Sequence, residues 1–253
     1  MIDVYYDMIF KRKSFHMFRE VTPLSNEELE EIQKEIEKVV PLHKDIKTHI
    51  KLVHKDKTSC KRGEYCILIY SEQKDGFLQN AGYIGEQLDL YLASKDIGVC
   101  WYGLAKPHEM KHEELDFLIM LAIGKTNPKH FRKDYRKCAR RPLEDISNLE
   151  CDKEILEVVR YAPSACNSQP WFIEMKDNTL NLYRTRGKKS IVPADKMSVI
   201  NRVDIGIITL FLDVYFTKHN IAFSKEIHED YVYEGEVALD KEERILNAVY
   251  RFN

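Results

Sequence analysis

The segment 163–171 carries the residue types best suited to holding a flat, polar ligand. It begins at Pro163 and reads Pro-Ser-Ala-Cys-Asn-Ser-Gln-Pro-Trp, so prolines restrict the backbone near both ends. The small side chains of Ser164 and Ala165 allow the main chain to approach a planar ring closely. Asn167 and Gln169 can hydrogen-bond either buried backbone groups or the polar edge of a ligand. The plainer alternative is a helix end followed by an ordinary strand.

Cysteine chemistry is not expected to drive the function. Cys166 lies within this segment, but no adjacent histidine could activate its thiol as a nucleophile, so we expect a small packed side chain there. The six cysteines contain no Cys-x-x-Cys pair. The sequence therefore predicts reduced thiols, with neither a zinc site nor a disulfide framework.

Two basic clusters could bind a phosphate group. The first is Arg12, Lys13 and Ser14 followed by His16, and the second is the pair Arg140 and Arg141. A guanidinium group pairs with phosphate through two parallel hydrogen bonds, and hydroxyl and backbone N–H groups add further donors. Either cluster alone could be a solvated basic turn. Two such clusters in one chain favour a phosphate site.

Together these motifs resemble those of the FMN-dependent nitroreductase family, in particular its fused, TM nitroreductase-like subgroup. In that family an Arg-Arg-Ser segment binds the FMN phosphate, a closing arginine returns to it, and a Pro-Ser-x-x-Asn loop faces the flavin. Here Lys13 stands for the second arginine and His16 for a later one, which weakens the expected phosphate binding. The specific motifs cover residues 12–16, 96–104, 140–146 and 163–171, although the outline extends over most of the chain.

The resemblance also implies residues close to the reactive edge of the flavin. It places Tyr102 and Gly103 near the flavin N5 atom, where a backbone donor would stabilise the reduced ring. The neighbouring Cys100 and Trp101 are expected to contact FMN as well, although the aromatic pair could instead be plain core. Lys61 or Arg62 could supply positive charge near N1 and O2, or could lie in a solvent-facing turn.

The implied reaction is electron transfer through FMN, so no catalytic acid or base is required from the protein. NADH or NADPH would stack on the flavin, deliver a hydride and leave. A flat acceptor such as a nitroaromatic or a quinone would then take its place, which is a ping-pong scheme. No Gly-x-Gly-x-x-Gly segment follows a strand, which argues against a separate Rossmann domain. Two alternatives stay open: a non-catalytic flavin-binding module for storage or sensing, and an interaction protein that keeps only the fold.

Composition limits the partners. The chain has 253 residues, with 39 basic and 41 acidic side chains and a net charge of -2. This balance gives no reason to expect binding to nucleic acid or to an anionic membrane. There is no apolar run of about 20 residues and no secretory signal at the start. We therefore expect a cytoplasmic protein that acts on a small molecule.

Hydrophobic periodicity predicts an α+β fold whose pattern starts twice. The first series has a helix ending before Arg12, a capping box at Ser25, and a long helix that stops near Asp96. Its strands are predicted over residues 50–53, 65–70 and 117–123. The second series has helices over 153–161 and about 199–218, a hairpin around 176–178 and a final strand over 245–252.

The two series align as a repeat. Residues 79–98 and 203–222 match at a constant offset of 124, with six identities in twenty positions, among them Gly82 with Gly206 and Asp89 with Asp213. Amphipathic helices share leucine and isoleucine spacing by default, which is the alternative explanation. Weaker correspondences elsewhere favour two fused copies, over residues 1–148 and 149–253.

Each predicted copy contains what the other lacks. The first has both basic clusters, but residues 39–44 stand where its flavin loop should be; the second has the loop but no basic opener. In nitroreductases the FMN site is built across a homodimer interface. The resemblance therefore implies an intramolecular pseudo-dimer of two degenerate copies, each a mainly antiparallel sheet packed by helices. It also implies one FMN per chain and a monomer, because the usual interface is satisfied internally.

Overall fold

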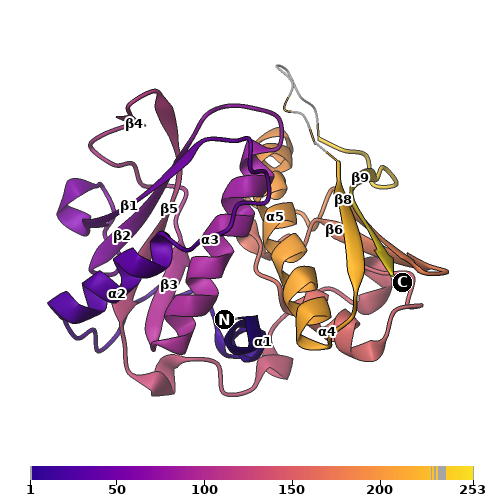
Figure 1. Ribbon diagram of the computed structural model, residues 1–253, viewed down its shortest axis with the longest axis horizontal. Helices are drawn as coiled ribbons and strands as arrows, with labels where there is room; N and C mark the ends of the chain where they lie inside the picture. Colours follow the sequence, from indigo (N-terminus) through magenta and orange to yellow (C-terminus); the bar gives the residue numbers. More distant parts are fainter. Residues whose placement is uncertain (1, 229, 231, 233–237, 253) are drawn as a thin grey trace.

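Two antiparallel sheets lie on opposite sides of a central layer of helices (Figure 1). The computed structural model describes residues 2–228, 230, 232 and 238–252. The long helices α3 (Phe77–Ser94) and α5 (Ala194–Lys218) pack against each other between the sheets. This arrangement confirms the predicted α+β class with antiparallel sheets covered by helices.

The first sheet comes from the N-terminal half and has the strand order β1-β2-β5-β3. Its strands are β1 (Thr48–His54), β2 (Tyr65–Ser71), β3 (Ile97–Trp101) and β5 (Leu115–Lys125), and the short β4 (Lys111–His112) pairs with β5. Strand β2 is rich in isoleucine, leucine and tyrosine and is almost completely buried, as expected for an inner strand covered on both faces.

The second sheet has the order β6-β7-β9-β8. Along the chain, both sheets begin with a hairpin, continue through a long helix to an edge strand, and end with an inner strand. Its strands are β6 (Trp171–Lys176), β7 (Thr179–Arg184), β8 (Phe223–Ile227) and β9 (Ile245–Phe252). The register shifts at matching places, between Ile69 and Tyr70 in β2 and between Leu182 and Tyr183 in β7. The two halves thus share one topology.

The shorter helices begin where the sequence provides caps. Helix α2 (Asn26–Ile36) starts after Ser25, which forms the predicted capping box with Glu28. Helix α4 (Lys153–Tyr161) starts after Asp152, whose carboxylate accepts the Glu154 N–H at 2.8 Å. Single-turn 3-10 segments connect the elements: η1 (Lys55–Lys57), η2 (Pro128–His130), η3 (Tyr135–Lys137), η4 (Leu143–Asp145) and η5 (Ala165–Asn167).

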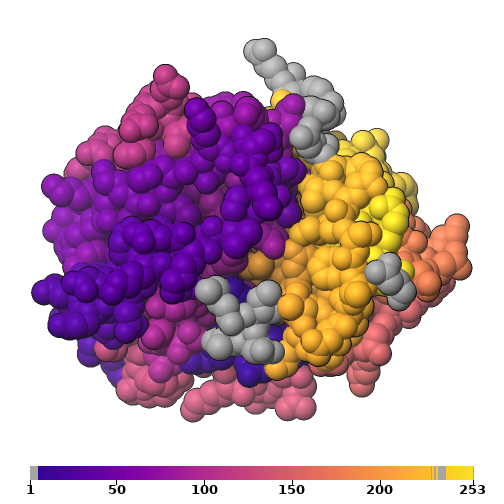
Figure 2. All heavy atoms as spheres, in the orientation of Figure 1, coloured from indigo at the N-terminus to yellow at the C-terminus, as the bar shows by residue number. Residues whose placement is uncertain are grey.

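Helix α1 (Ile2–Lys11) contacts both central helices. Its Ile9 side chain is fully buried, and Tyr5 donates a hydrogen bond to Glu35 of α2 at 3.2 Å. The space-filling view shows the indigo-to-magenta half and the orange half meeting along a boundary across this face (Figure 2). Helix α1 brings the residues that follow it to the junction of the halves.

Two glycines allow the central helices to cross at very short range. A Cβ atom on Gly82 would lie 2.0 Å from the Val203 carbonyl oxygen, and one on Gly206 would lie 1.9 Å from the Gln79 carbonyl oxygen. Any larger side chain would therefore force the helices apart. The two contacts correspond under the offset of 124 residues, so each helix presents the same surface to the other.

Some elements were not predicted. Strands β4 and β8 were missed, and residues 97–101, expected only as a flavin-facing segment, form strand β3. Helix α5 begins at Ala194, earlier than the predicted start near Val199. Within the described residues, no helix is both long and apolar enough to cross a membrane.

Candidate functional site

The loop after α4 has an unusual backbone. Three of its residues adopt left-handed conformations, with φ of 51° at Cys166, 54° at Asn167 and 47° at Gln169. Residues other than glycine rarely adopt left-handed backbone angles, and each such residue stores strain of about 1 kcal/mol or more. The loop is therefore held in place by its surroundings. Cys166 is exposed, so the prediction of a small packed residue there is wrong.

Helix α5 anchors the loop through two hydrogen bonds. Asp204 accepts the Ala165 N–H at 2.9 Å, and the Ser168 hydroxyl donates to Asn201 at 3.2 Å. Burial raises the pKa of Asp204 well above its ordinary value, and the Ala165 hydrogen bond only partly opposes this. Its second carboxyl oxygen has no hydrogen-bond partner among the described residues. Asp204 therefore favours its neutral, protonated form.

The second basic cluster closes over the other side of the loop. Arg140 donates to the Asn167 amide oxygen, and the Asn167 amide nitrogen donates to the Ala139 carbonyl at 3.0 Å. The Arg141 backbone N–H donates to Gln169 Oε1 at 2.7 Å, and its guanidinium donates to the Gln169 carbonyl at 2.9 Å. The amide side chains thus join two protein segments that the sequence predicted separately.

Inside the loop, Ser164 accepts the Gln169 N–H at 2.9 Å through its hydroxyl oxygen. Pro163 is buried at the point where the chain leaves α4. Gln169 also donates its amide to the Arg160 carbonyl of α4 at 3.3 Å. These contacts explain how the strained backbone conformation is maintained.

A cavity of about 310 Å³ lies between the loop and the second basic cluster. This volume is within the range of small-molecule sites. The cavity is lined by Ala139, Arg140, Arg141, Pro142, Asp145, Asn167, Gln169 and Lys188. Three cationic side chains and one carboxylate give it a positive character.

Arg140 in the wall of this cavity interacts electrostatically with two further arginines, Arg132 and Arg12. Burial, followed by the charges of Arg132 and Arg12, lowers the pKa of Arg140 to about 10. Burial and the charge of Arg12 also lower the pKa of Arg132. Arg12 Nη1, Arg132 Nη1 and Arg140 Nε are buried and find no hydrogen-bond partner among the described residues. An anion bound here would accept hydrogen bonds from these unpaired N–H groups and would reduce the repulsion between the three positive charges.

Arg12 was predicted to bind phosphate, and the structure also gives its guanidinium protein partners. Its side chain is 1% exposed, with Nη2 2.8 Å from Asp89 and Nε 3.5 Å from Glu86. Trp101 donates its indole N–H to the same two carboxylates at 3.2 Å. Burial and the Asp89 charge raise the pKa of Glu86 well above its ordinary value. Helix α3 thus connects Arg12 with Trp101, and within the described part of the chain Arg12 Nη1 has neither a hydrogen bond nor an ion pair.

Arg132 was missed in the sequence because it lies within a long polar and basic stretch without a motif. Its backbone N–H donates to the Lys11 carbonyl at 3.2 Å, which fixes it beside Arg12. Lys13 belongs to the same basic region, since burial and the charges of Arg132 and Arg19 lower its pKa. Its ammonium group lies 4.8 Å from the centre of the Phe15 ring.

The remaining predicted residues meet on the other face of β3. Arg62 Nη1 lies 3.3 Å from His16 Nδ1 and 3.2 Å from Cys100 Sγ. Its guanidinium carbon lies 4.4 Å from the centre of the Tyr102 ring. Ser14 forms a parallel bridge with Val99 of the same strand. Burial raises the pKa of Cys100, so this thiol favours its neutral form.

Gly103, which follows this segment, is exposed to solvent. Apart from its chain neighbours, no described residue has an atom within 4 Å of the position that a Cβ atom would occupy, so a flat ring could approach the backbone there. Among the described residues, no hydrogen bond or ion pair joins Tyr102 or Gly103 directly to the 163–171 loop. The neighbouring Trp101 is linked to Arg12 through Asp89.

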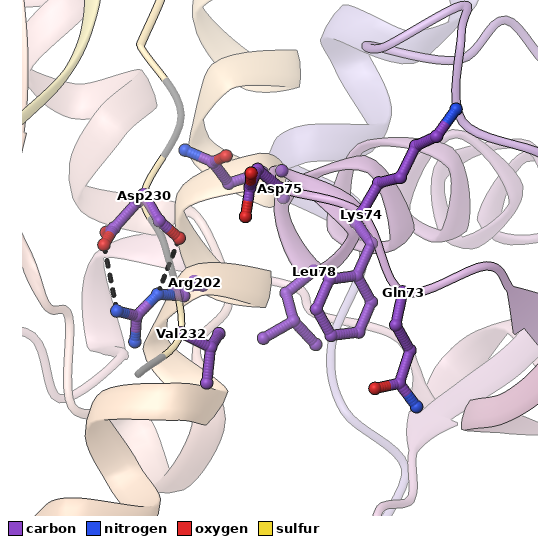
Figure 3. Close-up of a pocket in the computed structure, with 10 residues that line it drawn as sticks. Gln73, Lys74, Asp75, Leu78, Arg202, Asp230 and Val232 are labelled. Atoms are coloured by element: carbon purple, nitrogen blue, oxygen red, sulfur yellow. Dashed lines mark hydrogen bonds and ion pairs between the residues drawn. The ribbon is translucent and has the colours of Figure 1, made fainter. Parts of the chain in front are cut away.

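A second cavity, of about 200 Å³, lies between the start of α3 and the segment after β8 (Figure 3). Figure 3 shows Arg202 paired with Asp230 at its wall, at a distance of 3.0 Å. Arg184 forms a further ion pair with Asp230. This buried carboxylate is therefore shared by two arginines from within the protein.

Fold and site together define an α+β protein with two antiparallel sheets and a basic cavity beside the 163–171 loop. The model of a protein family described as "Putative TM nitroreductase" matches residues 4–215, most of the chain. The chain belongs to this TM nitroreductase family, and membership implies an oxidoreductase.

One solved structure gives an independent comparison of the fold. It is described as a putative nitroreductase from Thermotoga maritima, and the two chains are 20% identical with a TM-score of 0.60. The match covers 98% of this chain and 92% of the other. A search of curated proteins gave no match. At this identity the likeness establishes the shared fold.

Proposed function

We propose that this protein is an FMN-dependent oxidoreductase that passes electrons from NADH or NADPH to a flat acceptor such as a nitroaromatic or a quinone. The observation that carries the proposal is the group of three arginines with unused donors beside the strained loop. A phosphate monoester carries almost two negative charges at neutral pH, which would offset the mutual repulsion of Arg12, Arg132 and Arg140.

The residues present fit FMN at both of its ends. The phosphate would be held by the three arginines, with Lys13 and Ser14 nearby, and the ring would lie toward the 163–171 loop and the open backbone at Gly103. When bound, FMN supplies hydride transfer between a nicotinamide and the acceptor. Arg140 and Arg141 keep the loop in position by binding Asn167 and Gln169.

In its neutral form, Asp204 positions the same loop. A neutral carboxyl group adds no negative charge beneath an anionic cofactor, which an ionised aspartate would repel. Asp89 and Glu86 of α3 also position other residues, because they accept hydrogen bonds from Arg12 and Trp101. The chain's own part in the reaction is therefore binding, orientation and exclusion of water from the ring.

We also infer that residues 1–148 and 149–253 are duplicated copies. The identical strand orders, the reciprocal contacts of Gly82 and Gly206, and equivalent hydrogen bonds support this. Asn80 accepts the Leu42 N–H at 2.8 Å as Asp204 accepts the Ala165 N–H, at positions 124 residues apart. Each helix therefore holds the loop of its own half with the same residue position.

The pseudo-dimer predicts one FMN per chain. The region related to the proposed site by the repeat would lie beside the loop of the first half. That loop, residues 39–44, has no Pro-Ser-x-x-Asn sequence and is bound to α3 through Asn80. Two FMN molecules per chain, measured by released flavin against protein concentration, would contradict the loss of this second site. Sedimentation would test the expected monomer.

Absorbance spectroscopy separates the candidate functions. The purified chain reconstituted with FMN should retain a flavin band after gel filtration, and NADH or NADPH should bleach it without oxygen. Retention without bleaching would support the flavin-binding module for storage or sensing and reject the reductase. Failure to retain any flavin would leave only the interaction protein, in which the fold persists without a cofactor.

A further inference from the structure

One cationic side chain of the cavity beside the 163–171 loop has no protein partner. Lys188 lines this cavity together with Arg140 and Arg141. The guanidinium groups of both arginines already donate hydrogen bonds to the loop. Within the part of the chain that the structure describes, the Lys188 ammonium group has neither a hydrogen bond nor an ion pair. Its charge and its three N–H donors are therefore available to a ligand.

The backbone holds Lys188 against the loop. Its N–H donates to the Ser168 carbonyl at 2.7 Å, and the Thr185 N–H donates to the Pro170 carbonyl at 2.8 Å. Gly187 has φ of 67°, and a Cβ atom there would lie 3.1 Å from both the Ser168 oxygen and the Pro170 Cβ atom. Glycine adopts this conformation without strain and permits so close an approach. The turn therefore fixes the base of the lysine side chain at the cavity.

Charge and exposure distinguish this lysine from the proposed phosphate site. The cavity has Asp145 as its one acidic lining residue, and this carboxylate lies 3.7 Å from Arg141 Nε, so the lining as a whole stays positive. Lys188 is exposed, whereas Arg12 is 1% exposed. Buried arginines suit a cofactor that stays bound through many cycles. An exposed, flexible ammonium group suits a charged ligand that enters and leaves in each cycle.

The two proposed substrates differ in the charge that they would bring to this position. A quinone has no permanent negative charge. NADH carries an anionic pyrophosphate, and NADPH has in addition a 2′-phosphate with about two negative charges at neutral pH. Lysine binds a phosphate group as a point charge, without the fixed geometry that arginine requires. The lysine therefore matches the electron donor and contributes nothing to the recognition of an uncharged acceptor.

We propose that Lys188 binds a phosphate group of the pyridine nucleotide, which makes the outer side of this cavity a subsite for the electron donor. This assignment rests on the proposed function, in which the buried arginines hold the FMN phosphate. The neighbouring Arg141 adds positive charge while it keeps its bond to the loop. Binding of the 2′-phosphate would make the protein select NADPH, whereas binding of the pyrophosphate would serve NADH and NADPH alike.

Binding of nucleotide fragments tests the subsite without turnover. The full chain, incubated with FMN, is titrated in a calorimeter with adenosine 2′,5′-bisphosphate and with adenosine 5′-diphosphate. Lys188→Gln should raise the Kd of the first by about tenfold if the subsite takes the 2′-phosphate, or that of the second if it takes the pyrophosphate. Lys189→Gln, also exposed but outside the cavity lining, is the matched control and should change neither Kd.

Three results would overturn the subsite: no binding of either fragment to the wild type, unchanged Kd values in Lys188→Gln, or weaker FMN retention in this variant. The last would assign the lysine to the cofactor phosphate. Anaerobic bleaching of the flavin separates this proposal from the reductase. Loss of fragment binding in Lys188→Gln, with no bleaching of the wild type by either nucleotide, would support the subsite and reject the reductase. Bleaching with the same nucleotide affinity in both proteins would do the reverse.

Discussion

Asp204 beneath the 163–171 loop permits a quantitative test through the change Asp204→Asn. The amide keeps an oxygen that can accept the Ala165 N–H, but it cannot ionise. Because burial raises the pKa of Asp204 above its ordinary 3.8, the folded protein retains a proton that the unfolded chain has released. The resulting stability is fully present below the ordinary pKa and is lost as pH rises through the raised one.

The magnitude follows from one proton. Within that pH window, the wild-type free energy of unfolding should fall, through this group, by up to about 1.4 kcal/mol for each pH unit, and the variant should lack this loss. Glu86, whose pKa is also raised, contributes a slope of the same sign, but it is present in both proteins and cancels in their difference. Asp204→Asn should therefore gain stability over the wild type as pH rises.

Urea unfolding followed by circular dichroism, from about pH 5 to about pH 8, measures the difference directly. Asp7→Asn, on the exposed surface of α1, is the matched control and should show no pH-dependent gain. A difference between wild type and Asp204→Asn that stays constant over this range would refute the reasoning. It would mean that the buried carboxyl group is ionised in the folded protein.

Three further predictions concern packing and the cofactor. Gly206→Ala should destabilise the protein by about 1–3 kcal/mol or more, because its Cβ would lie 1.9 Å from a carbonyl oxygen, and calorimetry should show a lower Tm. Gly103→Ala has open space and should not change the Tm. Arg132→Gln should raise the FMN Kd about 10- to 100-fold in a flavin fluorescence titration, whereas Lys133→Gln on the exposed surface should not. Asn167→Ala should weaken FMN retention on gel filtration by releasing the loop from Arg140, and unchanged retention would contradict the assigned role.

The correspondence between the two long helices could be recognised from the sequence, although their packing against each other was not predicted. The offset of 124 residues matched Gly82 with Gly206 because close helix crossing leaves a strict requirement for glycine at both positions. The loop at 163–171 was also recognisable, since its small and amide residues occur at fixed spacing. Periodic burial and close backbone approach restrict which residue types can occupy neighbouring positions, so they can be recognised within one segment of the sequence.

Contacts between distant segments left weaker signals. Arg132 carries no motif, and only the chain path beside Lys11 brings it to Arg12. Strand β8 was missed because it is short and three consecutive polar residues separate its apolar ends, Phe223 and Ile227.

The reciprocal crossing of α3 and α5 has an evolutionary consequence under the proposed duplication. In a homodimer every substitution is made twice, and both copies of an interface must tolerate it. In one chain the copies can change separately, so position 80 can stay asparagine while its counterpart at 204 becomes a titratable aspartate. Covalent connection also keeps the halves at a high effective concentration. Under the proposed function, fusion thus lets the halves specialise differently, because the first supplies the buried arginines and the second supplies the 163–171 loop of one site.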